Sequence, residues 1–195
     1  MLFRSISFAQ QEHYGDLGWA NEIARRGYAV LVHDGFLFGS RRIQYEDVPE
    51  VLHRGRRDRR PESSAEIHRY NDWASEQESV VARSLLCAGT TWPGVFVQED
   101  QIALDILCKR RDVDADRVAC GGLSGGGLRT VYLAGLDDRI KAAVCVGFMT
   151  TWGDFLLHKS HTHTWMTYLP LAPRDFEFPE ILGLRVPLPT LVQNC

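Results

Sequence analysis

The sequence predicts an α/β domain with a mainly parallel central sheet. The apolar runs at 28–33 and 141–146 lack polar alternation, which is typical of strands buried on both faces of a parallel sheet. Segments with apolar residues at intervals of three and four separate such runs, which indicates helices between strands. The chain has 195 residues, of which 45% are hydrophobic, enough for one domain with a core. We therefore expect a single domain over 1–195.

The first half of the chain predicts two helices and one strand. A helix is expected over 12–26, because its apolar residues recur at three and four and Gly27 suits the position after a helix end. The strand at 28–33 follows directly. A charged surface insertion is expected over 41–64, and a long amphipathic helix over about 65–87 follows it.

The second half alternates short strands and helices. The chain breaks at 91–94, and apolar residues then stripe a helix around 102–107. The remaining expected elements are a strand at 117–120, a glycine-rich turn at 121–127, a helix at 128–136, and strands at 141–146 and 188–193.

Composition argues against several classes of partner and location. The formal net charge is −3, and acidic residues flank the basic stretch at 53–60, so a solvated loop is favoured over a nucleic-acid patch. Charged residues interrupt every apolar run, and the first residues lack the continuous apolar core of a secretion signal. We expect a cytoplasmic protein without nucleic-acid or membrane partners.

Three patterns that could suggest metal or disulfide chemistry are incomplete. The five cysteines are widely spaced and form no C-x-x-C pair, so they are interpreted as reduced thiols. The acids at 112–116 begin a calcium-loop pattern, but Arg117 and Leu123 stand where it needs Gly and an acid. The histidines at 158, 161 and 163 lack helical metal-site spacing and neighbouring carboxylates. We expect no metal and no cofactor.

The turn at 122–126 carries the chemical signal of this sequence. Gly122, Leu123, Ser124, Gly125 and Gly126 match the pattern G-x-S-x-G between an expected strand and an expected helix. In this context the serine takes a strained backbone conformation that exposes its hydroxyl, so Ser124 is the candidate nucleophile. The backbone N–H of Gly125 would supply half of an oxyanion hole.

Two other interpretations of this turn stay open. A glycine-rich turn between a strand and a helix can also bind a nucleotide phosphate, although 125–130 lacks the third glycine of the dinucleotide pattern. The turn can also be purely structural.

Around these residues the sequence resembles the α/β hydrolases, in particular the bacterial acetyl xylan esterase-like and dienelactone hydrolase-like enzymes. The resemblance implies the α/β-hydrolase fold, with helices on both faces of the sheet. It also implies attack of Ser124 on the carbonyl of a small ester, followed by hydrolysis of an acyl-enzyme. The segments that carry the resemblance are 19–22, 27–34, 88–94, 103–105, 113–114, 116–118, 122–127, 136–140, 163–166 and 187–192.

The resemblance also predicts that the chain is truncated at both ends. In similar enzymes the acid and the histidine of the triad follow the strand that resembles 188–193, so both are expected beyond Cys195. A loop that supplies the second oxyanion donor, and a strand between those resembling 28–33 and 117–120, are also expected to be missing. We therefore expect an incomplete α/β-hydrolase fold with little activity.

Two hypotheses concern what such a chain could still do. An internal triad would use Asp154 with His163, or with His158 or His161, although His163 can equally be a packing residue. Alternatively, the chain is a non-catalytic fragment whose open sheet edge pairs with a partner or a second copy, forming a homo-oligomer.

Overall fold

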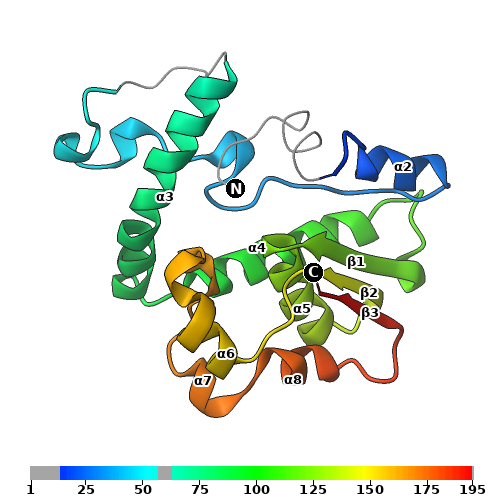
Figure 1. Ribbon diagram of the computed structural model, residues 1–195. Helices are drawn as coiled ribbons and strands as arrows, with labels where there is room; N and C mark the ends of the chain where they lie inside the picture. Colours follow the sequence, from blue (N-terminus) through cyan, green and yellow to red (C-terminus); the bar gives the residue numbers. More distant parts are fainter. Residues whose placement is uncertain (1–13, 57–62, 195) are drawn as a thin grey trace. The chain divides into compact units, whose positions relative to one another are not determined.

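The computed structural model of the protein describes residues 14–56 and 63–194. The chain divides into two compact units, Met1–Val80 and Val81–Cys195 (Figure 1). The two units are described separately.

Helices and short turns make up the described part of the first unit. Helix α2 is shorter than the expected 12–26 and ends where Gly27 adopts a φ of +90°, which its lack of a side chain permits. The long helix expected over 65–87 is confirmed as α3. The elements are α2 (Trp19–Arg25), η1 (Gly39–Arg41), η2 (Tyr45–Asp47), η3 (Glu50–Leu52) and α3 (Ser64–Cys87).

The segment expected as a charged insertion packs against α3 through its apolar residues. The Tyr45 ring lies 4.2 Å from the Trp73 ring, measured between centroids, and both side chains are buried. Tyr70 donates a hydrogen bond to the Ile43 carbonyl at 2.7 Å, and Trp73 donates one to the Leu52 carbonyl at 2.8 Å. This segment is therefore anchored, and its most basic residues, at 57–60, lie outside the described residues.

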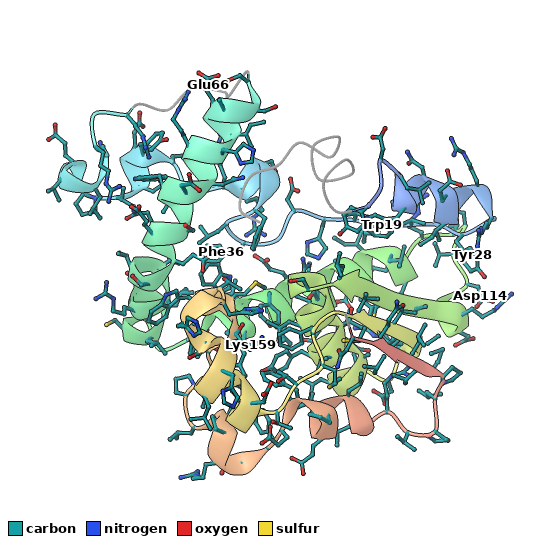
Figure 2. The ribbon with its side chains drawn as sticks, in the orientation of Figure 1. Trp19, Tyr28, Phe36, Glu66, Asp114 and Lys159 are labelled. Carbon is teal, nitrogen blue, oxygen red and sulfur yellow. The ribbon has the colours of Figure 1, made fainter. Side chains whose placement is uncertain are left out.

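The strand expected at 28–33 does not form, and that prediction is wrong. The segment has no strand structure, and Tyr28 and Val32 are 64% and 61% exposed (Figure 2). A strand is stabilised by a hydrogen-bonded neighbouring strand, and none of the described strands pairs with this segment. The apolar run identifies a strand-forming sequence but does not supply the partner.

The second unit contains the sheet and the helices around it. Its elements are α4 (Trp92–Cys108), η4 (Ala115–Arg117), β1 (Val118–Leu123), α5 (Gly125–Leu136), β2 (Ile140–Val146), α6 (Trp152–Asp154), the π-helical turn η5 (Phe155–Lys159), η6 (Ser160–Thr162), η7 (Trp165–Thr167), α7 (Ala172–Asp175), α8 (Phe178–Gly183) and β3 (Thr190–Gln193).

The described strands form one parallel sheet in the order β1-β2-β3 (Figure 1). Their positions confirm the expected strands at 117–120, 141–146 and 188–193, and β1 continues three residues further, to Leu123. The parallel α/β fold class is thus confirmed. Because β1 continues so far, the glycine-rich turn narrows to the single residue Ser124 before α5 begins.

Helix α4 begins earlier than its apolar stripe suggests. The sequence at 91–94 was expected to break the chain, but Trp92 is the first residue of the helix. The Thr91 side chain accepts a hydrogen bond from the Gly94 N–H at 3.0 Å and caps the helix. Pro93 fits because the first turn of a helix requires no N–H donor.

The core of the second unit lies between the sheet and α5. Helix α5 packs on β1 and β2, and α4 and α8 pack in turn on α5. Leu128 and Val131 of α5 are fully buried, whereas Val144 and its register partner Leu191 are 41% and 55% exposed. Within this unit, α5 covers one face of the sheet and the other face keeps exposed apolar side chains.

No single helix in residues 14–56 and 63–194 is long and apolar enough to cross a membrane. Helices α3 and α4 reach that length and apolarity only when they are counted together.

Candidate active site

Ser124 lies in the one-residue turn between β1 and α5. Its backbone has φ +56° and ψ −114°, which is unusual for a residue with a side chain and costs of the order of 1–3 kcal/mol. The residue is exposed, and within the described chain its hydroxyl makes no hydrogen bond. The turn therefore presents this hydroxyl to solvent in the strained conformation predicted from the G-x-S-x-G pattern.

Gly122 of the motif and Gly127, which directly follows the motif, allow the strands and the helix to approach closely. A Cβ built on Gly122 would lie 2.5 Å from the carbonyl carbon of Gly126, so no side chain fits there. One step along α5, a Cβ on Gly127 would lie 2.8 Å from the carbonyl oxygen of Val146 in β2. The glycines are thus required by backbone contacts on both sides of Ser124.

The turn is held at the carboxyl ends of the parallel strands. The Ser124 N–H donates a hydrogen bond to the carbonyl of Val146, the last residue of β2, at 2.8 Å. In open α/β sheets this end of the strands is where ligands bind. Gly125 is the first residue of α5, so its N–H has no acceptor within the helix and is suited to a developing oxyanion.

Within the described residues, no hydrogen bond joins the residues of the hypothesised internal triad. The Asp154 carboxylate accepts a hydrogen bond from the Thr150 hydroxyl at 3.2 Å, and His163 Nδ1 lies 3.3 Å from the Thr167 hydroxyl. Within the described residues, Asp154 makes no hydrogen bond or ion pair with His163. The half-buried His163 ring packs edge-to-face on Phe155, at a centroid distance of 5.4 Å. His158 and His161 are exposed.

Met166 is the neighbour of the turn that the motif did not identify. Its sulfur lies 3.5 Å from the position that a Cβ on Gly125 would occupy, and its side chain is 4% exposed. Met166 belongs to η7, far from Gly125 in the chain, and only folding places the two together. No local pattern in the sequence could have predicted this contact.

Residues 14–56 and 63–194 contain no cluster of three His, Cys, Asp or Glu residues placed to hold a metal ion. The calcium-like acids at 112–116 form a turn before β1, where Asp114 accepts a hydrogen bond from the Asp116 N–H at 3.0 Å. Figure 2 places Asp114 at the amino end of β1, the end of the strand away from Ser124.

Ion pairs fix the helices that support the turn. Arg129 of α5 pairs with Asp100 of α4, whose side chain is 8% exposed. Asp137, which follows α5, accepts hydrogen bonds from Arg139 at 2.8 and 2.6 Å. These bonds to the guanidinium hold the pKa of Asp137 below its usual range.

Comparison with known proteins agrees with this architecture. Residues 83–177 match the prolyl oligopeptidase family. The chain is 28% identical over 176 residues to the "Putative hydrolase YtaP" of Bacillus subtilis (strain 168), covering 89% of this chain. Its structure also resembles the crystal structure of a "putative acetyl xylan esterase" from Bacteroides fragilis NCTC 9343, with a TM-score of 0.67 and 21% identity over 93% of this chain.

The chain spans about half the length of these relatives. It covers 48% of the Bacillus protein and 44% of the Bacteroides chain. The matched regions include β1, Ser124 and α5 in the family comparison, so the turn lies within the shared part.

Proposed function

We propose that this chain is a hydrolase of the α/β-hydrolase superfamily that cleaves small carboxylic esters with Ser124 as nucleophile, a proposal that the matches to hydrolases support. The observation that carries the proposal is the backbone of Ser124, held at φ +56° and ψ −114° with its hydroxyl exposed. A purely structural turn has no need for a serine in this conformation, because glycine adopts it at lower cost. We therefore assign Ser124 the role of nucleophile in the proposed reaction.

The proposed reaction proceeds through an acyl-enzyme. Ser124 Oγ attacks the ester carbonyl carbon as the hydroxyl proton passes to a base, and the Gly125 N–H stabilises the resulting oxyanion. The bond to the alcohol oxygen then breaks, and the alcohol leaves with a proton. Water attacks the acyl-serine, which releases the carboxylic acid and restores the Ser124 hydroxyl.

The internal candidates for the base and for the acid that orients it are His163 and Asp154. His163 Nδ1 lies 3.3 Å from the Thr167 hydroxyl, and the Asp154 carboxylate accepts a hydrogen bond from the Thr150 hydroxyl, so within the described residues Asp154 does not orient His163 through a hydrogen bond. A serine without its base keeps the stabilisation from the oxyanion site, which in serine proteases leaves about 10³–10⁴-fold catalysis over water. We therefore propose that this chain acylates Ser124 slowly and selectively.

The test is selective acetylation by 4-nitrophenyl acetate. The 195-residue chain is incubated with the ester, and acetylated serines are located and timed by peptide mass spectrometry. We expect Ser124 to acquire acetyl at least about ten times faster than an exposed helical serine such as Ser75. Added imidazole should accelerate the reaction at Ser124, because it can serve as the proton acceptor.

The control is Ser124→Ala, in which acetylation elsewhere should be unchanged. Equal acetylation rates at Ser124 and Ser75 would refute the nucleophile assignment. Rapid acetylation of Ser124 without imidazole, abolished by His163→Ala and Asp154→Ala, would instead identify the internal triad.

A second candidate function is pairing through the edge of the sheet. Among the described residues β1 is hydrogen-bonded to β2 only, so its other edge has no strand beside it. An open edge of this kind is a template for a strand from a partner or a second copy. Gel filtration with light scattering tests this candidate: a concentration-dependent dimer supports it, and a monomer at all concentrations argues against self-pairing.

A further inference from the structure

A cavity of about 200 Å³ lies next to η7 in the second unit. We name it the η7 pocket; its walls come from the end of α3, the start of α4 and the chain around η7. The side chains that define it are Ala82, Leu86, Thr91, Trp92, Trp165 and Tyr168.

The η7 pocket has an apolar lining whose polar groups are already engaged. None of its lining residues carries a charge. The Thr91 hydroxyl oxygen accepts a hydrogen bond from the Gly94 N–H, and the Tyr168 hydroxyl donates one to the Ser160 carbonyl at 3.0 Å. Trp165 is 40% exposed, and its ring centroid lies 5.2 Å from that of Tyr168. Such a pocket favours an uncharged apolar group over a sugar or an anion.

Helical turn η7 connects this pocket to the Ser124 turn. Trp165 forms a pocket wall, and the next residue, Met166, contacts the backbone at Gly125. Consecutive Cα atoms are about 3.8 Å apart, so the pocket wall lies within a few side-chain lengths of the oxyanion donor. Met166 also occupies the space beside Gly125, with its sulfur 3.5 Å from the position that a Cβ on Gly125 would take.

We propose that the η7 pocket binds the apolar alcohol group of the ester that Ser124 attacks. This proposal rests on the proposed function, and it adds the substrate class: small-acyl esters of an aryl alcohol or an alkyl alcohol of about six carbons. The size is suitable, because an apolar cavity of about 150 Å³ in another protein binds benzene. The alcohol released by the reaction occupies the same pocket as a product.

The first experiment measures binding without catalysis. Bromine quenches indole fluorescence on contact, so 6-bromohexanol in the η7 pocket should quench the emission of Trp92 and Trp165 in the 195-residue chain to saturation. The longer 6-bromohexanol should bind more tightly than 2-bromoethanol, by up to about fourfold per methylene buried. Trp165→Phe should reduce the saturable component, and the saturable quenching that remains should come from Trp92, which also lines the pocket.

Matched variants separate the pocket from its surroundings. Ala82→Leu places extra volume in the pocket and should weaken 6-bromohexanol binding at least about tenfold, with circular dichroism reporting an unchanged fold. Leu157→Ala removes an apolar side chain that is 78% exposed and not part of the lining, and should leave binding unchanged. The proposal would be overturned if quenching increased linearly with 6-bromohexanol concentration, without saturation, and equally in the parent and in Ala82→Leu.

The second experiment links the pocket to Ser124. In the parent, 6-bromohexanol should compete with 4-nitrophenyl acetate and slow the acetylation of Ser124, and Ala82→Leu should not show this protection. Ser124→Ala should bind 6-bromohexanol as the parent does, so loss of the nucleophile and loss of the pocket are distinguished. Saturable binding without protection of Ser124 would show that the pocket is not the alcohol site.

Discussion

A Cβ on Gly122 would lie 2.5 Å from the carbonyl carbon of Gly126, whereas a Cβ on Gly126 would meet nothing within 4 Å. The two flanking glycines of the motif are therefore not equivalent. Gly122 is required for the close approach of β1 and α5, and Gly126 occupies an open position in the first turn of α5.

This asymmetry predicts opposite effects of two alanine substitutions. Gly122→Ala should lower the free energy of unfolding by about 2–3 kcal/mol, because backbone atoms must move to admit the methyl group. Gly126→Ala should be neutral or raise stability by up to about 1 kcal/mol, because alanine favours a helix. Urea denaturation of the two variants checks this, and similar losses in both would contradict the geometry.

The backbone of Ser124 predicts a stability gain on loss of the nucleophile. Glycine adopts a positive φ without steric cost, whereas alanine keeps the Cβ that strains this position. Ser124→Gly should therefore be more stable than Ser124→Ala by about 1 kcal/mol, after the larger entropy of unfolded glycine is taken into account. Thermal unfolding of the pair measures the difference, and a less stable glycine variant would show that the position is not strained.

The buried hydrogen bonds of Arg185 predict a large loss of stability when its guanidinium is removed. The side chain is 5% exposed and donates to the carbonyls of Ile140 in β2, at 3.1 Å, and of Pro189 at the entry to β3, at 2.6 Å. Arg185→Met should cost about 3 kcal/mol, because it leaves buried carbonyls without donors. Arg174→Met, at a side chain that is 71% exposed, is the control and should change stability by less than about 0.5 kcal/mol in urea.

The hydrogen bonds between Arg139 and Asp137 predict that the folded protein loses stability in acid. Hydrogen bonds from Arg139 lower the pKa of its carboxyl in the folded state. The resulting stabilisation is complete above the unfolded pKa of about 3.9 and disappears as the pH falls through the folded pKa. Asp137→Asn should cost about 1–2 kcal/mol at pH 7, a modest value because Arg139 is 40% exposed to screening solvent.

The pH profile provides the check. Between pH 6 and pH 2 the parent should lose more stability than Asp137→Asn, while the exposed neighbour variant Asp138→Asn should follow the parent. Parallel profiles for the parent and Asp137→Asn would contradict the assigned pairing.

The described thiols should react in an order set by exposure. Burial raises the pKa of Cys120 to about 12, so roughly one molecule in ten thousand carries its thiolate at pH 8. Cys87 is exposed, and Cys145 is fully buried with its pKa also raised by burial. Iodoacetamide followed by peptide mass spectrometry should modify Cys87 well before Cys120 and Cys145. Early modification of Cys120 in the folded chain would contradict its raised pKa.

Local sequence patterns predicted several of the helices and strands in both units. Helices α3 and α5 follow from apolar periodicity, and strands β1 and β2 from short apolar runs, because these signals depend on neighbouring residues. The start of α4 at Trp92 was missed, because the sequence suggested a break where Thr91 instead caps the helix. The segment at 28–33 was predicted incorrectly, because a strand also needs a partner from elsewhere.

The sequence by itself determined the nucleophile candidate. Ser124 and its glycines are contiguous, and a turn between a strand and a helix is encoded within a few residues. Only the tertiary structure decided what surrounds it: Met166 beside Gly125, the separate contacts of Asp154 and His163, and the η7 pocket. These contacts join residues far apart in the chain, so their geometry depends on how whole elements pack, which no local pattern encodes.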